Sequence, residues 1–289
     1  MRLFYFENEK GNRMPLNNEN GIFLYSPDGL GVSYSNNYNS TGLGFFIRVK
    51  DGLSQNEITF TLVYPPGDDS PYERYRSLMD WIFSSEKIYF VYCPYGGTEY
   101  YRNVEISSIG KSELDMYGAL QSEVSVLPLT PWYIPSPIVI DFNHEEEGTM
   151  RYDFYYDDDL IYGEGKTNYV VNVVNTGHMP AAIHFSFSGE VNNPVLTLRG
   201  SDSRKEYGVC TISESFRTGD TLEFSTAEQD SYVKKIDKDG TVTDLLDKID
   251  ITTNPFFRVP LNEPCEVSIS AESIYGDATM TLYIYYRGV

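Results

Sequence analysis

The sequence is poor in cysteine, and its few cysteines follow no recognised spacing. They are Cys93, Cys210 and Cys265, in a chain of 289 residues. An odd number without a C-x-x-C pair argues against both a disulfide framework and a zinc site. We therefore expect three reduced and mostly buried thiols, as in a protein made in a cytoplasm.

Cationic side chains are also scarce. The chain has 22 Lys and Arg against 42 Asp and Glu, a net charge of −20, and no basic run is longer than two. Duplex nucleic acid and anionic membrane surfaces both attract proteins through Lys and Arg, so we expect neither as a ligand. The apolar run near the N-terminus is too short for a signal peptide, and no stretch reaches the roughly 20 apolar residues that span a bilayer. Membrane insertion is not expected.

Motifs of catalysis and metal binding are missing too. There is no G-x-S-x-G elbow, no phosphate-binding G-x-x-x-x-G-K-[ST] loop and no G-x-G-x-x-G after a strand. The segment 144–148, HEEEG, lacks the second histidine of a zinc helix, and the adjacent carboxylates of 157–159 point apart. The turn at 239–240 lacks the glycine spacing of an EF-hand. We expect no enzyme, no cofactor and no tightly bound metal, and leave open weak calcium binding at these acidic loops.

Aromatic residues, in contrast, are abundant, with 25 Tyr, 16 Phe and 2 Trp. Most of them fall in patterns typical of β-strands. Residues 58–64 alternate between two faces, and residues 87–106 form a strand, a Pro/Gly turn and a second strand, which predicts a hairpin. Residues 120–129 predict a further strand. The segment 42–45, GLGF, is interpreted as a short turn.

One helix is predicted, beginning after Ser70. Ser70 can cap it, Pro71 suits the first helical position, and Glu73 completes an S-x-x-E capping box. Apolar side chains then recur at helical spacing, which predicts a packed face of about three turns. They are Tyr72, Tyr75, Leu78, Met79 and Ile82.

A proline-rich stretch at 126–137 divides the chain. Because proline cannot continue a helix or a central strand, we expect it to close an N-terminal domain, 1–135, and to open a C-terminal one, 136–289. Strand patterns then recur about every ten residues, with hairpin turns expected at 192–194 and 239–240 and a short helical pattern at 242–250. The expected fold is mainly β: an α+β domain of β-sheets with one α-helix, followed by a β-sandwich or jelly roll. An ordinary loop inside a single domain is the alternative for this stretch.

The order of these features resembles a known family. The tyrosine-rich helix, LTPWY at 129–133, SGEVNNP at 188–194 and VPLNEPCEVSI at 259–269 follow one another as in the distal tail proteins of long-tailed, non-contractile (siphovirus-type) bacteriophages. The resemblance covers nearly the whole chain, although the segment 144–159 is more acidic than expected for the family. It implies a ring-forming N-terminal domain and a galectin-like C-terminal domain.

The resemblance also implies a function. Such proteins form a hexameric ring at the virion tail tip, after synthesis in the host bacterial cytoplasm. The ring joins the tail tube protein to the tail hub or tail-associated lysin, and the outer domains can hold receptor-binding or other baseplate parts for host adhesion. No cofactor is implied. We expect aromatic side chains at the ring or domain interface: Tyr72, Tyr75, Tyr95, Tyr100, Tyr101, Trp132 and Tyr133.

Charge and composition also bear on which domain forms the ring and on an alternative function. The part up to Tyr133 carries a net charge of −6 and the rest −14, so packing six copies of the N-terminal part around an axis meets less repulsion. The alternative function is a carbohydrate-binding module of the tail tip that contacts host cell-wall saccharide, with aromatic side chains as stacking platforms. Residues 192–199 hold only a fragment of the His, Asn, Arg and Trp cluster of a galectin sugar site.

Overall fold

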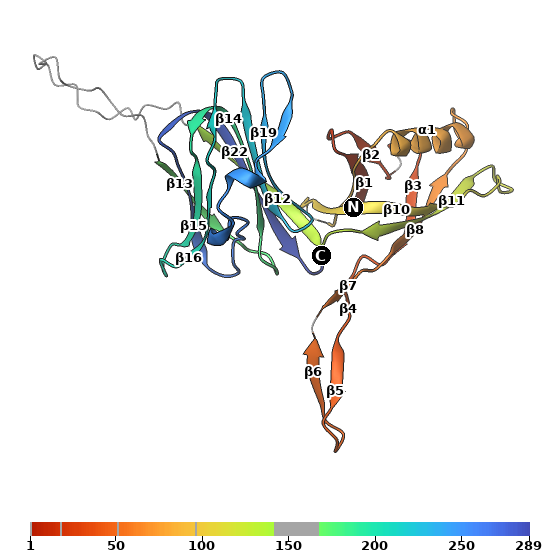
Figure 1. Ribbon diagram of the computed structural model, residues 1–289. Coiled ribbons are helices and arrows are strands. Elements are labelled where there is room, and N and C mark those ends of the chain that lie inside the picture. The colour runs from red at the N-terminus through yellow and green to blue at the C-terminus, as the bar shows by residue number, and fades with distance from the viewer. Residues whose placement is uncertain (1, 18, 51, 96, 142–167) are drawn as a thin grey trace, which may run out of the picture. The chain divides into compact units, whose positions relative to one another are not determined.

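The computed structural model describes residues 2–17, 19–50, 52–95, 97–141 and 168–289 (Figure 1). The chain divides into two compact units: Met1–Ile134 together with Tyr286–Val289, and Pro135–Tyr285. Both are built from antiparallel strands, so the expected mainly-β fold class is confirmed. Among the described residues no helix has the length and apolar character needed to cross a membrane.

Unit 1 contains one curved antiparallel sheet and the helix α1. The sheet order is β2-β1-β9-β10-β11-β8-β3, and the predicted hairpin of residues 87–106 is confirmed as β9 and β10. Two short ribbons, β4–β7 and β5–β6, lie outside this sheet. The strands are β1 Leu3–Asn8, β2 Arg13–Pro15, β3 Phe23–Asp28, β4 Ser33–Tyr34, β5 Asn37–Ser40, β6 Phe46–Lys50, β7 Leu53–Ser54, β8 Ile58–Tyr64, β9 Ile88–Cys93, β10 Tyr100–Ile109 and β11 Leu120–Pro128.

The predicted helix is confirmed as α1, Pro71–Phe83. The backbone N–H of Ser70 donates to the Glu73 carboxylate over 3.3 Å, which satisfies one of the free amides at the helix start. Leu78 and Ile82 are buried and pack on the core of unit 1. That core is mainly aromatic, and its fully buried side chains include Phe6, Phe90 and Trp132.

The C-terminal end of the chain belongs to unit 1, unlike the expected second domain, which runs to residue 289. The strand β22, Ser273–Tyr286, ends at a tyrosine that packs against unit 1. The rings of Tyr100 and Tyr286 meet edge to face, with centroids 5.6 Å apart and planes at 87°. An aromatic contact of this kind contributes about 1 kcal/mol beyond the area it buries. The proline-rich stretch at 126–137 could not predict that the C-terminal residues pack in unit 1.

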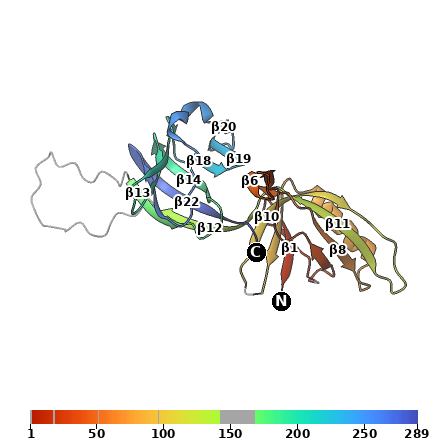
Figure 2. The same ribbon diagram turned by 90° about the horizontal axis from the view of Figure 1, so that it is seen from below.

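Unit 2 is the expected β-sandwich, formed by two antiparallel sheets (Figures 1 and 2). One sheet has the order β12-β22-β14-β18-β19-β20, with β17 paired to β14, and the other has the order β13-β21-β15-β16. Alternate side chains such as Phe185 and Phe187 point into the core. The remaining strands are β12 Trp132–Asp141, β13 Asn168–Val174, β14 Ala182–Asn192, β15 Val195–Gly200, β16 Glu206–Thr211, β17 Ser215–Phe216, β18 Thr221–Ala227, β19 Asp230–Ile236, β20 Val242–Asp244 and β21 Pro264–Ser270.

Two local predictions in this unit have opposite outcomes. The turn at 239–240 is a hairpin between β19 and β20, and the N–H of Gly240 donates to the carbonyl of Asp237 over 2.8 Å. The predicted hairpin at 192–194 is wrong, because β14 and β15 lie in different sheets and Asn193, at φ 48°, turns the chain from one to the other.

The pattern at 242–250 resolves into β20 and one 3₁₀ turn, Leu246–Lys248, and a second 3₁₀ turn, Ile251–Thr253, follows it. The apolar residues have helical spacing, but the segment is too short to form a regular helix. The segments 144–148 and 157–159 lie outside the described residues.

Candidate functional site

A long hairpin, residues 33–54, leaves the sheet of unit 1 and is the feature most suited to binding another protein (Figure 1). Its stalk is the ribbon β4–β7, in which Tyr34 faces Leu53, and its outer part is β5–β6, in which Ser40 faces Phe46. Within the outer part the register shifts between Asn37 and Tyr38. We call residues 33–54 the arm.

The tip of the arm is a tight turn built on two glycines. The N–H of Thr41 donates to the carbonyl of Phe45 over 3.0 Å, and the N–H of Phe45 donates to that of Gly42 over 3.2 Å. Gly42 and Gly44 have φ of 80° and 79°, values that glycine adopts without steric penalty. Between them Leu43 also lies in the left-handed region, at φ 51°, and 97% of it is exposed. The turn therefore presents a leucine to the solvent.

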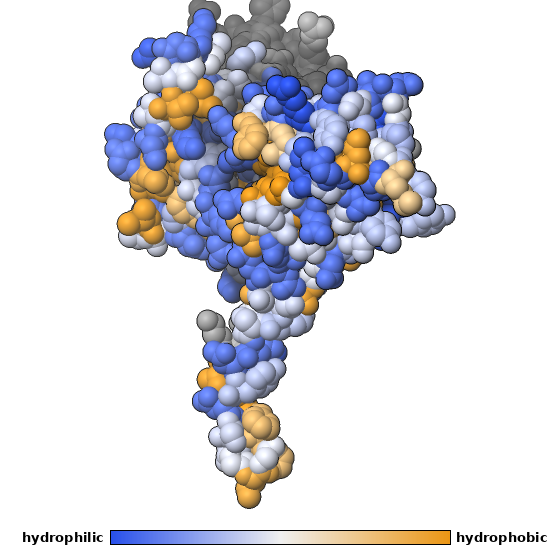
Figure 3. Space-filling model, turned by 90° about the vertical axis from the view of Figure 1, so that its right-hand side faces the viewer, coloured by the Kyte–Doolittle hydropathy of each residue, from blue (hydrophilic) through white to orange (hydrophobic). Residues whose placement is uncertain are grey.

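Apolar side chains are exposed along the arm, and Figure 3 shows several of them at its tip on the face that it displays. Phe46 and Ile47 are neighbours on β6 and so point to opposite faces, yet they are 69% and 60% exposed. An isolated two-stranded ribbon is marginally stable in water, and a contiguous exposed apolar surface is typical of a protein interface. More than half of each of these side chains is exposed: Tyr34, Tyr38, Leu43, Phe45, Phe46, Ile47 and Val49.

The charge of the arm is opposite to that of the rest of the chain. Residues 29–50 contain no Asp or Glu but include Arg48 and Lys50, in a chain with a net charge of −20. Arg48 lies on the exposed strand β6. An apolar surface with a positive charge complements an acidic surface rather than a basic one.

The base of the arm is held by hydrogen bonds to residues that are distant from it in the sequence. The indole Nε1–H of Trp132 donates to the carbonyl of Leu30 over 3.1 Å, and Gln55 Nε2 donates to the carbonyl of Pro128 over 2.9 Å. Just before the arm, Gly29 adopts φ 78°. A Cβ at this position would overlap the carbonyl oxygen of Glu57, so only glycine fits.

Arg102 supports the same anchor. Its guanidinium lies over the Trp132 ring, 5.1 Å from the centroid, and its Nε–H donates to the carbonyl of Thr130 over 2.8 Å. Burial lowers the pKa of Arg102 to about 10, because the charged form loses hydration. The group is still charged at neutral pH and stacks on the indole as a cation.

The residues expected at an interface are spread over unit 1. Trp132 is fully buried in its core. Tyr133 is also buried and stacks on Tyr101 at 5.9 Å between centroids, while its hydroxyl donates to Asn103 over 2.9 Å. Tyr100 packs on Tyr286, as described above. In this conformation the buried side chains stabilise the unit itself.

Tyr72 and Tyr75 lie together on α1, with the ammonium group of Lys111 4.7 and 6.0 Å from their ring centroids. The Tyr72 hydroxyl donates to the Glu113 carboxylate over 2.6 Å, and this hydrogen bond raises the pKa of Tyr72. Tyr95, at 91% exposure, projects into solvent. An interface role for these residues stays a prediction.

Sequence reasoning missed the arm. The segment 42–45 is indeed a turn, but the run FFIRV that follows it, at 45–49, has the composition of a buried strand. One feature of the sequence could have indicated the arm: residues 29–50 contain no acidic residue, although the chain as a whole is strongly acidic. Hydrophobicity alone does not distinguish a strand buried in its own domain from one exposed for a partner.

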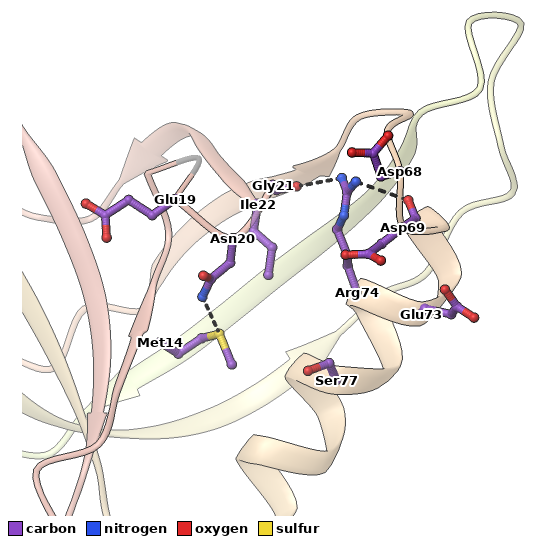
Figure 4. Close-up of a pocket in the computed structure, with 10 residues that line it drawn as sticks. All are labelled: Met14, Glu19, Asn20, Gly21, Ile22, Asp68, Asp69, Glu73, Arg74 and Ser77. Atoms are coloured by element: carbon purple, nitrogen blue, oxygen red, sulfur yellow. Dashed lines mark hydrogen bonds between the residues drawn. The ribbon is translucent and has the colours of Figure 1, made fainter.

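A second feature of unit 1 is a hollow beside the start of α1, shown in Figure 4, with a volume of about 560 Å³. Four carboxylates line it, while the apolar side chains are those of Met14 and Ile22. We call it the acidic hollow. The carboxylates belong to Glu19, Asp68, Asp69 and Glu73.

The one arginine lining the acidic hollow is held by backbone groups. Arg74 Nη1 donates to the carbonyls of Pro65, over 2.8 Å, and Gly21, over 3.3 Å, and Nη2 donates to that of Asp69 over 3.0 Å. The guanidinium thus ties the loop before α1 to the loop before β3 (Figure 4). Even with this cation the acidic hollow is net negative, so it favours a cationic ligand.

Within the described parts of the chain, no three His, Cys, Asp or Glu side chains come together as metal ligands would. The chemistry that the geometry does provide is that of association: an exposed apolar arm with a positive charge, and an acidic hollow, both in unit 1.

Comparison with known proteins agrees with this type of function. Residues 3–129 match the family model described as the distal tail protein, N-terminal domain. A search of curated protein sequences found no significant match.

Solved structures resemble the whole chain. A chain in the structure of the phage P2 baseplate in its activated conformation with Ca is 15% identical, with 100% of both chains covered and a TM-score of 0.69. The Dit protein of phage SPP1, described as a paradigm of the hub adsorption apparatus in phages that infect Gram-positive bacteria, is 9% identical, with 97% and 98% covered and a TM-score of 0.55. The resemblance to phage distal tail proteins is confirmed: residues 3–129 match the model of that family's N-terminal domain, and these solved structures share the fold of the chain.

Proposed function

We propose that this protein assembles with copies of itself into a hexameric ring at the tip of a phage tail, where it joins the tail tube to the tail hub or tail-associated lysin. Its role is structural rather than enzymatic. Unit 1 forms the ring, and unit 2, as a galectin-like domain, holds receptor-binding or other baseplate parts. The family match of residues 3–129 supports the tail assignment.

The observation that carries the self-assembly is the exposed arm. In the described part of the chain, β4 pairs only with β7 and β5 only with β6, and both faces carry exposed aromatic and aliphatic side chains. A two-stranded ribbon is at best marginally stable in water by itself, and a surface that covers it stabilises it. In a ring each copy offers two different faces, one giving and one receiving, and the arm suits the giving face.

The distribution of charge supports the division between the units. The part up to Tyr133 has a net charge of −6, while the rest has −14. Six copies of unit 1 around an axis therefore repel one another less than six copies of unit 2 would. An acidic protein also suits a channel through which DNA passes without binding, since there are few cations to replace its counterions.

The test is the mass of the full-length protein in solution, measured by light scattering and by native mass spectrometry. We expect six copies for the unmodified chain. Replacing Leu43, Phe45 and Phe46 by Ser should give monomers whose circular dichroism is unchanged, because these side chains contribute little to either core. The matched control is Tyr275→Ser, which removes an aromatic side chain that is 66% exposed on unit 2 and should leave the assembly intact. Hexamers from the arm variant would contradict the proposal.

A further inference from the structure

We infer that the acidic hollow beside α1 receives the tip of the arm from a neighbouring copy of this chain. The inference rests on the proposed ring and names the two surfaces that meet in it. The occupant is residues 41–49 of the second copy.

The acidic hollow has the chemistry of a receptor for such a segment. It is lined by four acidic residues and by two apolar ones, Met14 and the largely buried Ile22. The guanidinium of Arg74 is occupied by three backbone carbonyls. At about 560 Å³ it is within the size range of sites that enclose a small ligand or a few side chains. Several carboxylates beside a small apolar surface fit a ligand that carries a positive charge next to apolar side chains.

The arm is the part of this chain with that character. Leu43, Phe45 and Phe46 supply an exposed apolar tip, and Arg48 lies two residues further along the same strand. Residues 41–49, the proposed occupant, contain no acidic side chain, so they bring no repulsive charge to the carboxylates. Opposite potentials on the two surfaces would steer them together and fix their register.

The geometry favours contact between copies rather than within one. The arm extends away from the end of unit 1 that carries α1, as Figure 1 shows, whereas the acidic hollow lies beside the start of α1. One copy therefore presents the arm at one place and the acidic hollow at another. This is the head-to-tail arrangement in which identical subunits close a ring.

A charge-swap experiment tests the pairing. Arg48→Glu and Asp68→Lys, each made alone in the full chain, should weaken assembly at least about 10-fold in the protein concentration required, because each places like charges in contact. Combining the two should restore assembly to within about 3-fold of the unmodified protein, as coupled residues do in a double-mutant cycle. The matched controls are Arg76→Glu and Asp80→Lys on exposed positions of α1 outside the acidic hollow, which should change nothing.

A cross-link locates the contact directly. Leu43→Cys and Asp68→Cys proteins, mixed and oxidised, should give a disulfide-linked dimer, while Leu43→Cys mixed with Asp80→Cys should not. A ring that forms without this cross-link and tolerates Asp68→Lys would place the tip of the arm outside the acidic hollow. This result would overturn the inference and leave the proposed ring intact. A protein that stays monomeric at every concentration would overturn both.

Discussion

The indole of Trp132 is hydrogen-bonded to the carbonyl of Leu30, over 3.1 Å and across 102 positions of the chain. Trp132 belongs to the proline-rich stretch that ends unit 1, and Leu30 precedes the exposed arm. The bond therefore fixes the point at which the arm leaves the sheet. A large aromatic residue between prolines has a structural purpose here, since its ring fills the core while its N–H orients an assembly element.

Trp132→Phe tests this anchor. The ring is largely kept, but the Leu30 carbonyl loses its donor, which should lower the free energy of unfolding by about 1–3 kcal/mol. It should also make the arm more sensitive to proteases, because its base is less firmly held. Denaturant unfolding and limited proteolysis measure the two effects. Trp81→Phe is the control, since Trp81 is not hydrogen-bonded to the base of the arm, and it should leave the cleavage rate of the arm unchanged.

Gly29→Ala should be far more damaging than Gly11→Ala, although both positions have positive φ, of 78° and 75°. A methyl group at position 29 overlaps the carbonyl of Glu57, while position 11 has open space around it. We expect a loss of about 1 kcal/mol at position 11, from the backbone conformation alone, and about 3 kcal/mol or more at position 29. Equal losses of unfolding free energy would show that the close approach to Glu57 is absent.

The three cysteines should react as free thiols only after unfolding. All three are buried and unpaired with one another. Burial raises the pKa of Cys210 to about 12 and, together with Glu263, that of Cys265 to about 11, so little reactive thiolate exists at pH 8. Titration with a thiol reagent should be slow in the native protein and should count three thiols per chain in denaturant without reductant. A count of one would reveal a disulfide.

Lys235 should stabilise unit 2 in a pH-dependent manner. Its ammonium lies 3.1 Å from Asp220, 3.6 Å from Asp237 and 3.9 Å from Glu214. The N–H of Arg217, and after it Lys235, lowers the pKa of Asp220, so this carboxylate stabilises the fold above its unfolded pKa and the benefit is lost as the pH falls through the lowered value.

We therefore expect Lys235→Met to cost about 2 kcal/mol at pH 7 and progressively less as the pH falls toward 2 and Asp220 becomes protonated. Thermal unfolding at both pH values measures the difference. The control is Lys248→Met, because Lys248 lies on the surface 4.0 Å from Asp247 and should have little effect at either pH. A loss that is the same at pH 7 and pH 2 would contradict the role of Asp220.

The parts of the fold that the sequence predicted are those with local causes. Ser70, Pro71 and Glu73 define the start of α1 by their own hydrogen bonds and backbone geometry. The turn at 192–194 was recognised as a turn, but its residues carry no information on whether the strands on either side pair or belong to different sheets. That choice depends on the packing of the whole sandwich.

The candidate site was less predictable for a physical reason. Aromatic residues are frequent both in protein cores and at interfaces, so their presence in a sequence does not distinguish the two locations. Trp132 was expected at a ring or domain interface, and the structure places its side chain in the core of unit 1. The apolar run of the arm has the pattern of a buried strand, yet it is exposed. A core segment and an interface segment can be distinguished only by whether the rest of the chain packs against them.

The central claim is that this protein closes into a ring through unit 1. Electron microscopy of the purified full-length protein tests it most directly, because a ring is recognised by its outline and central hole without any partner. We predict six-fold rings for the unmodified chain and dispersed single copies for the variant in which Leu43, Phe45 and Phe46 are replaced by Ser. Dispersed single copies of the unmodified protein, or rings that persist without these three side chains, would contradict it.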